Sequence, residues 1–153
     1  RGKGRHFMGN KTIVAGVIER GGDVRLKVVG DASRRTLQAF LGQHIRPDTQ
    51  RVITDEWAGY QGIGDADTKH EVVNHSAKEY VRGDVHTNTA ETVWSLLKRS
   101  IIGSYHHLSE KHLDAYLDEL EWRFNNRKNP YLFRDTLTKL LKAAKLEYRE
   151  LTA

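Results

Sequence analysis

The stretch TIVAGVIERGGDVRLKVVG, residues 12–30, decides the class of fold. Apolar residues recur at every second position on both sides of Gly21-Gly22-Asp23, so that they share a face of an extended chain. On the first half, the shared face carries Ile13, Ala15 and Val17. Such alternation is typical of strands, and glycine beside aspartate supplies a tight turn between two of them. The sequence therefore predicts a β-hairpin here.

Outward from the hairpin, the pattern predicts helices mixed with short strands. The expected elements are a helix over 31–46 with caps in Asp31-Ala32-Ser33, a strand over 51–54, a short helix or turn over 57–64, a strand over 71–74, a first long helix with an apolar stripe from Ala90 to Ile101, a second capped by Ser109, and a third over about 131–146. This order predicts an α/β fold with a mixed sheet flanked by helices. It matches an RNase H-like sheet that lacks its first strand.

Length and composition fit one folded domain over residues 1–153. Chains of this size bury roughly 68–70% of the surface of the unfolded chain, and 38% of the residues are apolar. No apolar run approaches the roughly 18 residues of a membrane helix, and nothing resembles a signal peptide. The absence of cysteine excludes disulfides, thiolate zinc sites and a cysteine nucleophile. We therefore expect a cytoplasmic protein with no membrane partner.

Charge is distributed unevenly along the chain. Residues 1–51 hold 11 Lys and Arg against 4 Asp and Glu, whereas residues 52–90 hold 3 against 7. A basic beginning beside an acidic middle suits a protein that holds a polyanion at one surface and a divalent metal at another. An ordinary basic surface explains the charge equally well.

Two acids and a lysine form the candidate site. Asp55 is expected at the carboxyl end of a strand, and Glu91 follows on the first long helix after 35 intervening residues. Lys98 comes seven residues after Glu91, about 20° away around the helix, so both charges lie on one side. Mg²⁺ is held by one or two carboxylates together with substrate phosphates. The layout predicts metal-dependent phosphoryl transfer, with Lys98 as a phosphate contact.

Each of these residues also has a structural interpretation. Asp55 fits a turn residue or a helix cap in Thr-Asp-Glu-Trp. Glu91 fits a capping box over residues 88–91, in which its side chain returns to a free N–H of the first turn. Lys98 fits a solvated charge on a surface helix. Spacing alone leaves both sets of interpretations open.

Histidines and tryptophans add weaker signals. Six of the eight histidines lie between His70 and His112, without HExxH or helical i, i+4 ligand spacing, which argues against a zinc site. His106 and His107 are interpreted as a phosphate-contacting or helix-linking turn. The tryptophans, at positions 57, 94 and 122, are interpreted as packing residues, although the one beside Glu91 is also placed to meet a nucleotide.

The chain resembles the catalytic domain of bacterial insertion-sequence transposases of the DDE superfamily, in the ISXO-like branch. Three motifs between residues 70 and 127 carry the resemblance, HTNTAETVWSLLKR, YHHLS and RFNNR, and two upstream stretches match it, VAGVIERGG and VITDEWAGY. It implies that Asp55 is the second acid of the triad, Glu91 the third, and Lys98 the lysine that follows the third acid.

The resemblance also implies a mechanism and partners. Asp55 and Glu91 are then ligands of two Mg²⁺ (or Mn²⁺) ions, which promote cleavage of the element's ends and attack of the freed 3′-hydroxyl on target DNA. The implied DNA contacts are Lys98, Arg99, His106, His107 and Arg127. A homo-oligomer assembled on DNA, acting at the bacterial nucleoid, is the expected form.

One part of the family pattern is absent. The family's first acid belongs to a DE-x-Y-x-GG-type motif on the first strand, upstream of the basic loop that is RGKGRH here, and neither Asp23 nor Asp31 matches it. The expectation is an amino-terminally truncated RNase H-like catalytic domain that is inactive, or nearly so, alone. Two other functions stay open, a non-catalytic DNA-binding or assembly domain on the same fold and a structure-specific nuclease.

Overall fold

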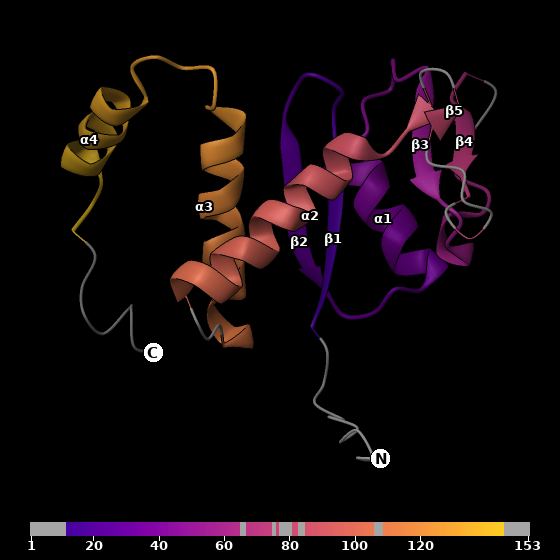
Figure 1. Cartoon of the computed structure of the whole chain (residues 1–153), viewed down its shortest axis with the longest axis horizontal. Coiled ribbons are helices and arrows are strands. Elements are labelled where there is room, and N and C mark those ends of the chain that lie inside the picture. The colour runs from indigo at the N-terminus through magenta and orange to yellow at the C-terminus, as the bar shows by residue number, and fades with distance from the viewer. Residues whose placement is uncertain are drawn as a thin grey trace.

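The computed structural model describes residues 12–64, 67–74, 76, 81–82, 85–105 and 109–145, and it is a mixed α/β structure, as predicted (Figure 1). The elements are β1 (Ile13–Ile18), β2 (Val24–Val29), α1 (Arg34–His44), β3 (Arg51–Asp55), η1 (Ala58–Tyr60), β4 (Lys69–Val73), β5 (Val81–Arg82), β6 (Val85–His86), α2 (Asn88–Ser100), η3 (Ile101–Tyr105), η4 (Glu110–His112), α3 (Leu113–Asn125) and α4 (Leu132–Lys142). None of the described helices combines the length and apolar character of a membrane span.

The predicted hairpin is confirmed. β1 and β2 are antiparallel, and Ile18 opposite Val24 is the last pair before the turn. Gly21 has a φ of 73°, a left-handed conformation that glycine adopts without steric cost. The turn is closed by the N–H of Glu19, which donates to the carbonyl of Asp23 at 2.9 Å.

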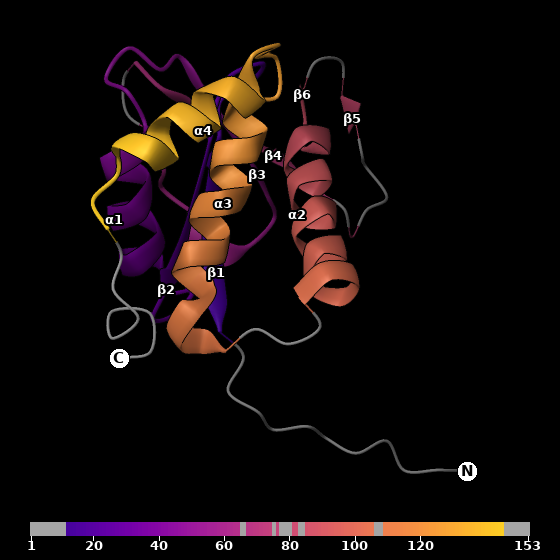
Figure 2. The same ribbon diagram turned by 90° about the vertical axis from the view of Figure 1, so that its left-hand side faces the viewer.

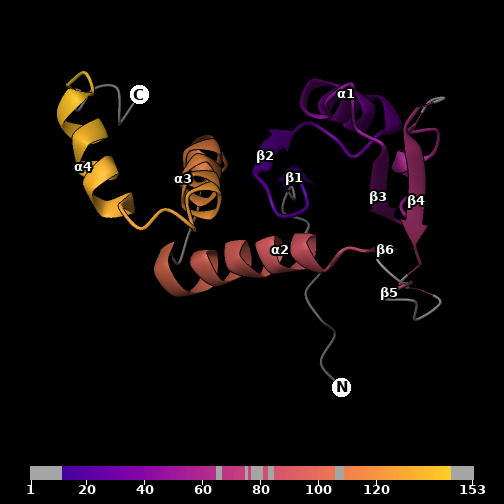
Figure 3. The same ribbon diagram turned by 90° about the horizontal axis from the view of Figure 1, so that it is seen from above.

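Each face of the hairpin packs on its own helices. Figure 3 shows α1 on one side of β1 and β2 and α2 on the other. The α1 side has a buried cluster of Ala15, Leu37, Phe40 and Leu41. The cluster toward α2 and α3 consists of Val24, Leu26, Val93, Leu97, Leu113, Leu117 and Phe124. The hairpin therefore contributes side chains to two hydrophobic clusters, one on each face, because successive side chains of a strand point to opposite faces.

Helix α3 covers the outer edge of β2. The backbone N–H of Val24 donates to Asn125 Oδ1 at 2.8 Å, and the N–H of Leu26 donates to a carboxylate oxygen of Glu121. Figure 2 shows α3 alongside the hairpin, and α4 lies in front of α3 at an angle to it. Polar side chains thus take the hydrogen bonds that another strand would take at this edge, which protects it from pairing with other chains.

The strands of the described residues do not form one mixed sheet, so that part of the prediction is wrong for them. β1 and β2 form an antiparallel ladder, β3 and β4 a parallel one, and β5 and β6 a third. In Figures 1 and 3, β1 is the hairpin strand nearer to β3, and Figure 1 shows the two running in opposite directions. Within the described residues, β1 pairs only with β2 and β3 only with β4.

Several predicted boundaries need correction. Ser33 is the N-cap of α1, as predicted, and its Oγ accepts from the N–H of Thr36. Ser109 instead precedes the short turn η4 and makes no side-chain cap bond. α4 ends at Lys142 rather than near residue 146, because Ala143 is extended. The short strands β5 and β6 lie between β4 and α2, where no element was predicted.

Candidate functional site

Asp55 is the last residue of β3, and its side chain is exposed. Its Oδ1 accepts a hydrogen bond from the N–H of Trp57 at 3.1 Å, as in a turn that follows an aspartate. The predicted position at the carboxyl end of a strand is therefore confirmed. The turn interpretation also holds, because the same carboxylate orients the chain toward η1.

The end of β3 is held by a polar pair next to Asp55, of which Thr54 is buried and His70 is half-buried. Thr54 is only 8% exposed, and its hydroxyl donates to the carbonyl of Asp55 at 2.8 Å. His70 Nε2 of β4 lies 2.9 Å from the same hydroxyl, within hydrogen-bond distance, so the pair links β3 to β4. Burial lowers the pKa of His70, which keeps the ring neutral at neutral pH.

Tyr60 of η1 lies within the electrostatic influence of Asp55. Burial, and secondarily the charge of Asp55, raise the pKa of the Tyr60 phenol. The phenol therefore stays protonated at neutral pH. The motif VITDEWAGY is thus a strand end, an aspartate turn and a short helix that together present Asp55 to solvent.

Glu91 lies in the first turn of α2, and its side chain is exposed. Thr87 is the N-cap residue, one position earlier than the predicted capping box requires. Because of this shift, Glu91 Oε1 accepts from the hydroxyl of Thr87 at 3.2 Å. A carboxylate here is also favoured by the positive end of the helix dipole. The side chain thus has a local structural role and remains at the surface.

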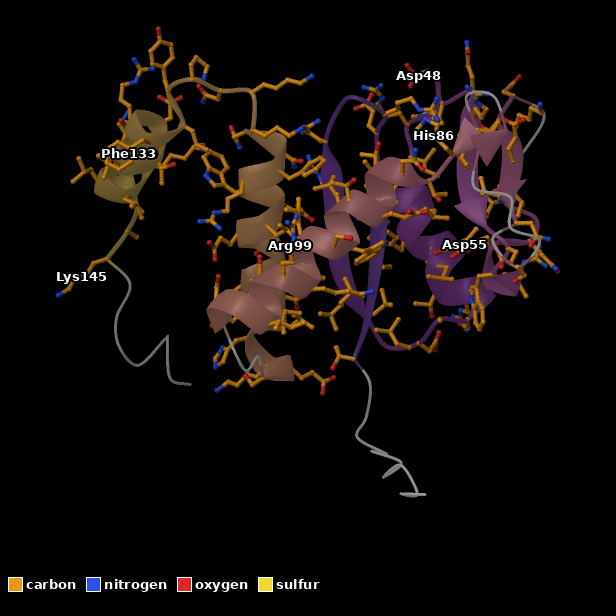
Figure 4. The ribbon with its side chains drawn as sticks, viewed as in Figure 1. Asp48, Asp55, His86, Arg99, Phe133 and Lys145 are labelled. Atoms are coloured by element: carbon orange, nitrogen blue, oxygen red, sulfur yellow. The ribbon has the colours of Figure 1, made fainter. Side chains whose placement is uncertain are left out.

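Lys98 and Arg99 occupy the last turn of α2, with exposed side chains. Lys98 lies seven positions after Glu91 on the helix, a rise of about 10 Å. Figure 4 shows Arg99 in front of the hairpin and Asp55 far from it, near the end of β3. A phosphate bound by Arg99 is therefore a different one from a phosphate beside Asp55. His106 and His107 lie outside the described residues.

Comparison with known proteins identifies the family. Residues 1–125 match the model of the ISXO2-like transposase domain. The chain belongs to this family. It is also similar to an uncharacterized transposase-like protein of Haemophilus influenzae, with 28% identity over 99 residues that cover 65% of this chain and 78% of the relative. No solved structure matches the chain.

Membership of the ISXO2-like transposase domain family confirms the resemblance seen in the motifs, and it implies a protein of DNA transposition that interacts with DNA. The match ends at Asn125, the last residue of α3. Helix α4 therefore follows the part of the transposase domain that the family shares.

Arg127, in the RFNNR motif of the transposase domain, has structural partners. Its Nη1 and Nη2 atoms each donate to the carbonyl of Gly22 at 3.2 Å, and Nη1 also donates to the carbonyl of Phe124 at 2.7 Å. The guanidinium lies over the Phe124 ring, 4.1 Å from its centroid. Arg127 therefore ties the end of α3 to the hairpin turn, and its contact with DNA stays a prediction beside this role.

The three tryptophans of the transposase domain differ in their surroundings. Trp94 packs against the cluster under α2, where a Cβ on Gly16 would come within 3.1 Å of its ring. Trp122 is covered by the Lys139 ammonium, 3.6 Å from the ring centroid. The packing interpretation is confirmed for Trp94. Trp57, in contrast, is 55% exposed beside Asp55, which hydrophobic patterning did not indicate.

Proposed function

We propose that this transposase domain contributes Asp55 and Glu91 to a DDE active site that cleaves the ends of an insertion sequence and joins them to target DNA. The observation that carries the proposal is Asp55, an exposed carboxylate at the end of a parallel strand, within the region that matches the family. Ligand sites in open α/β sheets form at such strand ends.

The side chains suit two Mg²⁺ or Mn²⁺ ions as cofactors. Both Asp55 and Glu91 offer exposed carboxylate oxygens, which are the ligands that these hard cations prefer. Bound metal supplies an activated nucleophile and stabilises the leaving oxygen. In the part of the chain that is described, no group of three or more His, Asp or Glu side chains is arranged to hold a metal. A further acid is therefore needed to hold both ions.

The directions and unpaired edges of the strands support one position for that acid. β1 and β3 run in opposite directions, and each is paired on one edge only within the described residues (Figure 1). A strand antiparallel to β1 and parallel to β3 would join both ladders into one mixed sheet of the RNase H type. We propose that the first acid of the family pattern lies on such a strand, beside Asp55.

Strand joining is the test of this function. A version of the domain that carries the proposed first strand, incubated with element-end DNA, target plasmid and Mg²⁺, is expected to cut the end and join it to the target. These 153 residues alone are expected to show little or no cleavage. Cleavage without joining would favour a structure-specific nuclease. Binding with neither reaction would favour a non-catalytic assembly domain. Robust cleavage by this chain alone would contradict the need for a further acid.

DNA binding is expected to depend on the basic end of α2. Phosphate contacts release counterions, so Lys98→Ala should lower the slope of log affinity against log salt by about one unit. Lys142→Ala is the matched control, because Lys142 lies on α4, outside the family match. Titration of labelled DNA at several salt concentrations measures both. An unchanged slope for Lys98→Ala would make Lys98 a solvated surface charge.

The proposal includes assembly of several copies on DNA. An insertion sequence has two ends, and each end needs an active site that holds it during joining. Homo-oligomer formation on paired element ends is therefore part of the proposed function.

A further inference from the structure

We propose that Trp57 is a stacking platform for an unpaired nucleobase at the site of Asp55. This inference rests on the proposed function, because it assigns the indole to the same DNA. Of the three tryptophans, Trp57 is the most exposed, at 55%, and it follows Asp55 by two residues. Its ring is therefore available beside the carboxylate that is proposed to hold metal and phosphate.

The indole is held in one orientation. The backbone N–H of Trp57 donates to Asp55 Oδ1 at 3.1 Å, and its ring Nε1 donates to the carbonyl of Ala32 at 3.2 Å. Gly59 lies directly against the ring, since a Cβ there would come within 2.8 Å of Nε1. Two contacts thus hold the ring, and a third holds its backbone, before any ligand binds. A preorganised ring loses little conformational freedom on binding.

The one polar atom of the indole is already hydrogen-bonded within the protein. Its single N–H donates to Ala32, so contact with water gains it nothing further. Trp94 packs against a buried cluster, and Trp122 is covered by the Lys139 ammonium. Among the described residues, no cation lies over the Trp57 ring in this way, and the residue stays 55% exposed beside Asp55.

A nucleobase suits this surface better than a paired duplex does. Bases inside a duplex already stack on their neighbours, whereas an unpaired base offers a free face to an aromatic side chain. Base and phosphate belong to the same nucleotide. A nucleotide whose phosphate is held at Asp55, as proposed, can therefore place its own base against Trp57. Every base has a π-face, so the platform is expected to accept any sequence.

The test is titration of this chain with a thymidine oligonucleotide of about 15 nucleotides in the presence of Mg²⁺, followed by tryptophan emission and by anisotropy of a labelled strand. Trp57→Ala and Trp57→Leu are each expected to weaken binding about 5- to 150-fold. Trp57→Phe keeps an aromatic face and should retain most of the affinity. Tyr131→Ala is the control, because this exposed aromatic residue precedes α4 beyond the family match, and affinity should not change.

Three results would overturn the platform. They are wild-type affinity in a folded Trp57→Ala variant, equal affinity in the Leu and Phe variants, and loss of the same size in Tyr131→Ala. Circular dichroism checks the fold of each variant, and Trp57→Phe provides the comparison if Trp57→Ala does not fold. The proposed function is tested separately, by measuring whether cleavage by the version with the first strand depends on Asp55. Cleavage that needs Asp55 together with unchanged binding by Trp57→Leu would refute only the platform.

Discussion

Replacement of Asp55 by asparagine, or of Glu91 by glutamine, is expected to abolish metal-dependent cleavage in a version of the domain that carries the first-strand acid. A carboxylate that ligates catalytic metal supports several kcal/mol of transition-state stabilisation, which corresponds to a loss of about 10³-fold or more. Both substitutions keep the shape of the side chain. Asn keeps the Oδ1 acceptor for the Trp57 N–H, and Gln keeps the Oε1 acceptor for the Thr87 hydroxyl.

Because the local hydrogen bonds survive, a lost reaction would report on the metal rather than on the fold. Asp48→Asn is the matched control, since Figure 4 shows Asp48 away from Asp55, where its carboxylate pairs with Arg46 at 3.5 Å. Cleavage is measured on labelled element-end DNA with Mg²⁺, and then with Mn²⁺. Full activity in Asp55→Asn would remove Asp55 from the metal site and leave it as a turn residue.

Asn125→Ala is expected to have the largest effect on stability. The Asn125 side chain accepts from the N–H of Val24 at 2.8 Å and donates to its carbonyl at 3.1 Å. Val24 is fully buried. The unsatisfied N–H of Val24 should cost about 1–3 kcal/mol, and the bond lost at its carbonyl about 1 kcal/mol more, because that carbonyl keeps the hydrogen bond from Arg25 Nη1 at 2.8 Å. The free energy of unfolding should therefore fall by about 2–4 kcal/mol. That is a large share of the roughly 5–15 kcal/mol that stabilises a typical domain.

Urea unfolding measures this loss, with Asn126→Ala as the control in the same motif. Asn126 donates to the carbonyl of Trp122 within its own helix end, and the loss of this single bond should cost about 1 kcal/mol. Equal destabilisation by the two variants would show that the link from Asn125 to β2 contributes little.

The RFNNR motif is therefore a structural clamp in this domain. Phe124 is buried in the cluster under α2, Asn125 binds the start of β2, and Arg127 binds Gly22 in the hairpin turn. These contacts join the end of α3 to the hairpin and give the motif a structural role.

Local patterning predicted the elements that depend on near neighbours. The hairpin follows from period-two alternation around Gly21, and α1 follows from its apolar spacing and the Ser33 cap. Asp55 was placed correctly at a strand end for the same reason. Helix ends were predicted less accurately, as at the end of α4 (Lys142) and the start of α2 (Thr87). The terminal turns of a helix depend on side-chain partners as much as on periodicity.

The sequence by itself determined the family, the hairpin and the two acids that are proposed to bind metal, since motifs and periodicity are properties of short stretches of chain. Only the tertiary structure decided the partners of Asn125, which bonds a strand 101 positions away, and of Arg127, which bonds Gly22 105 positions away. It also decided that Trp94 packs over Gly16 while Trp57 stays exposed. The exposure of a side chain depends on which distant segments fold over it, and no local pattern contains that information.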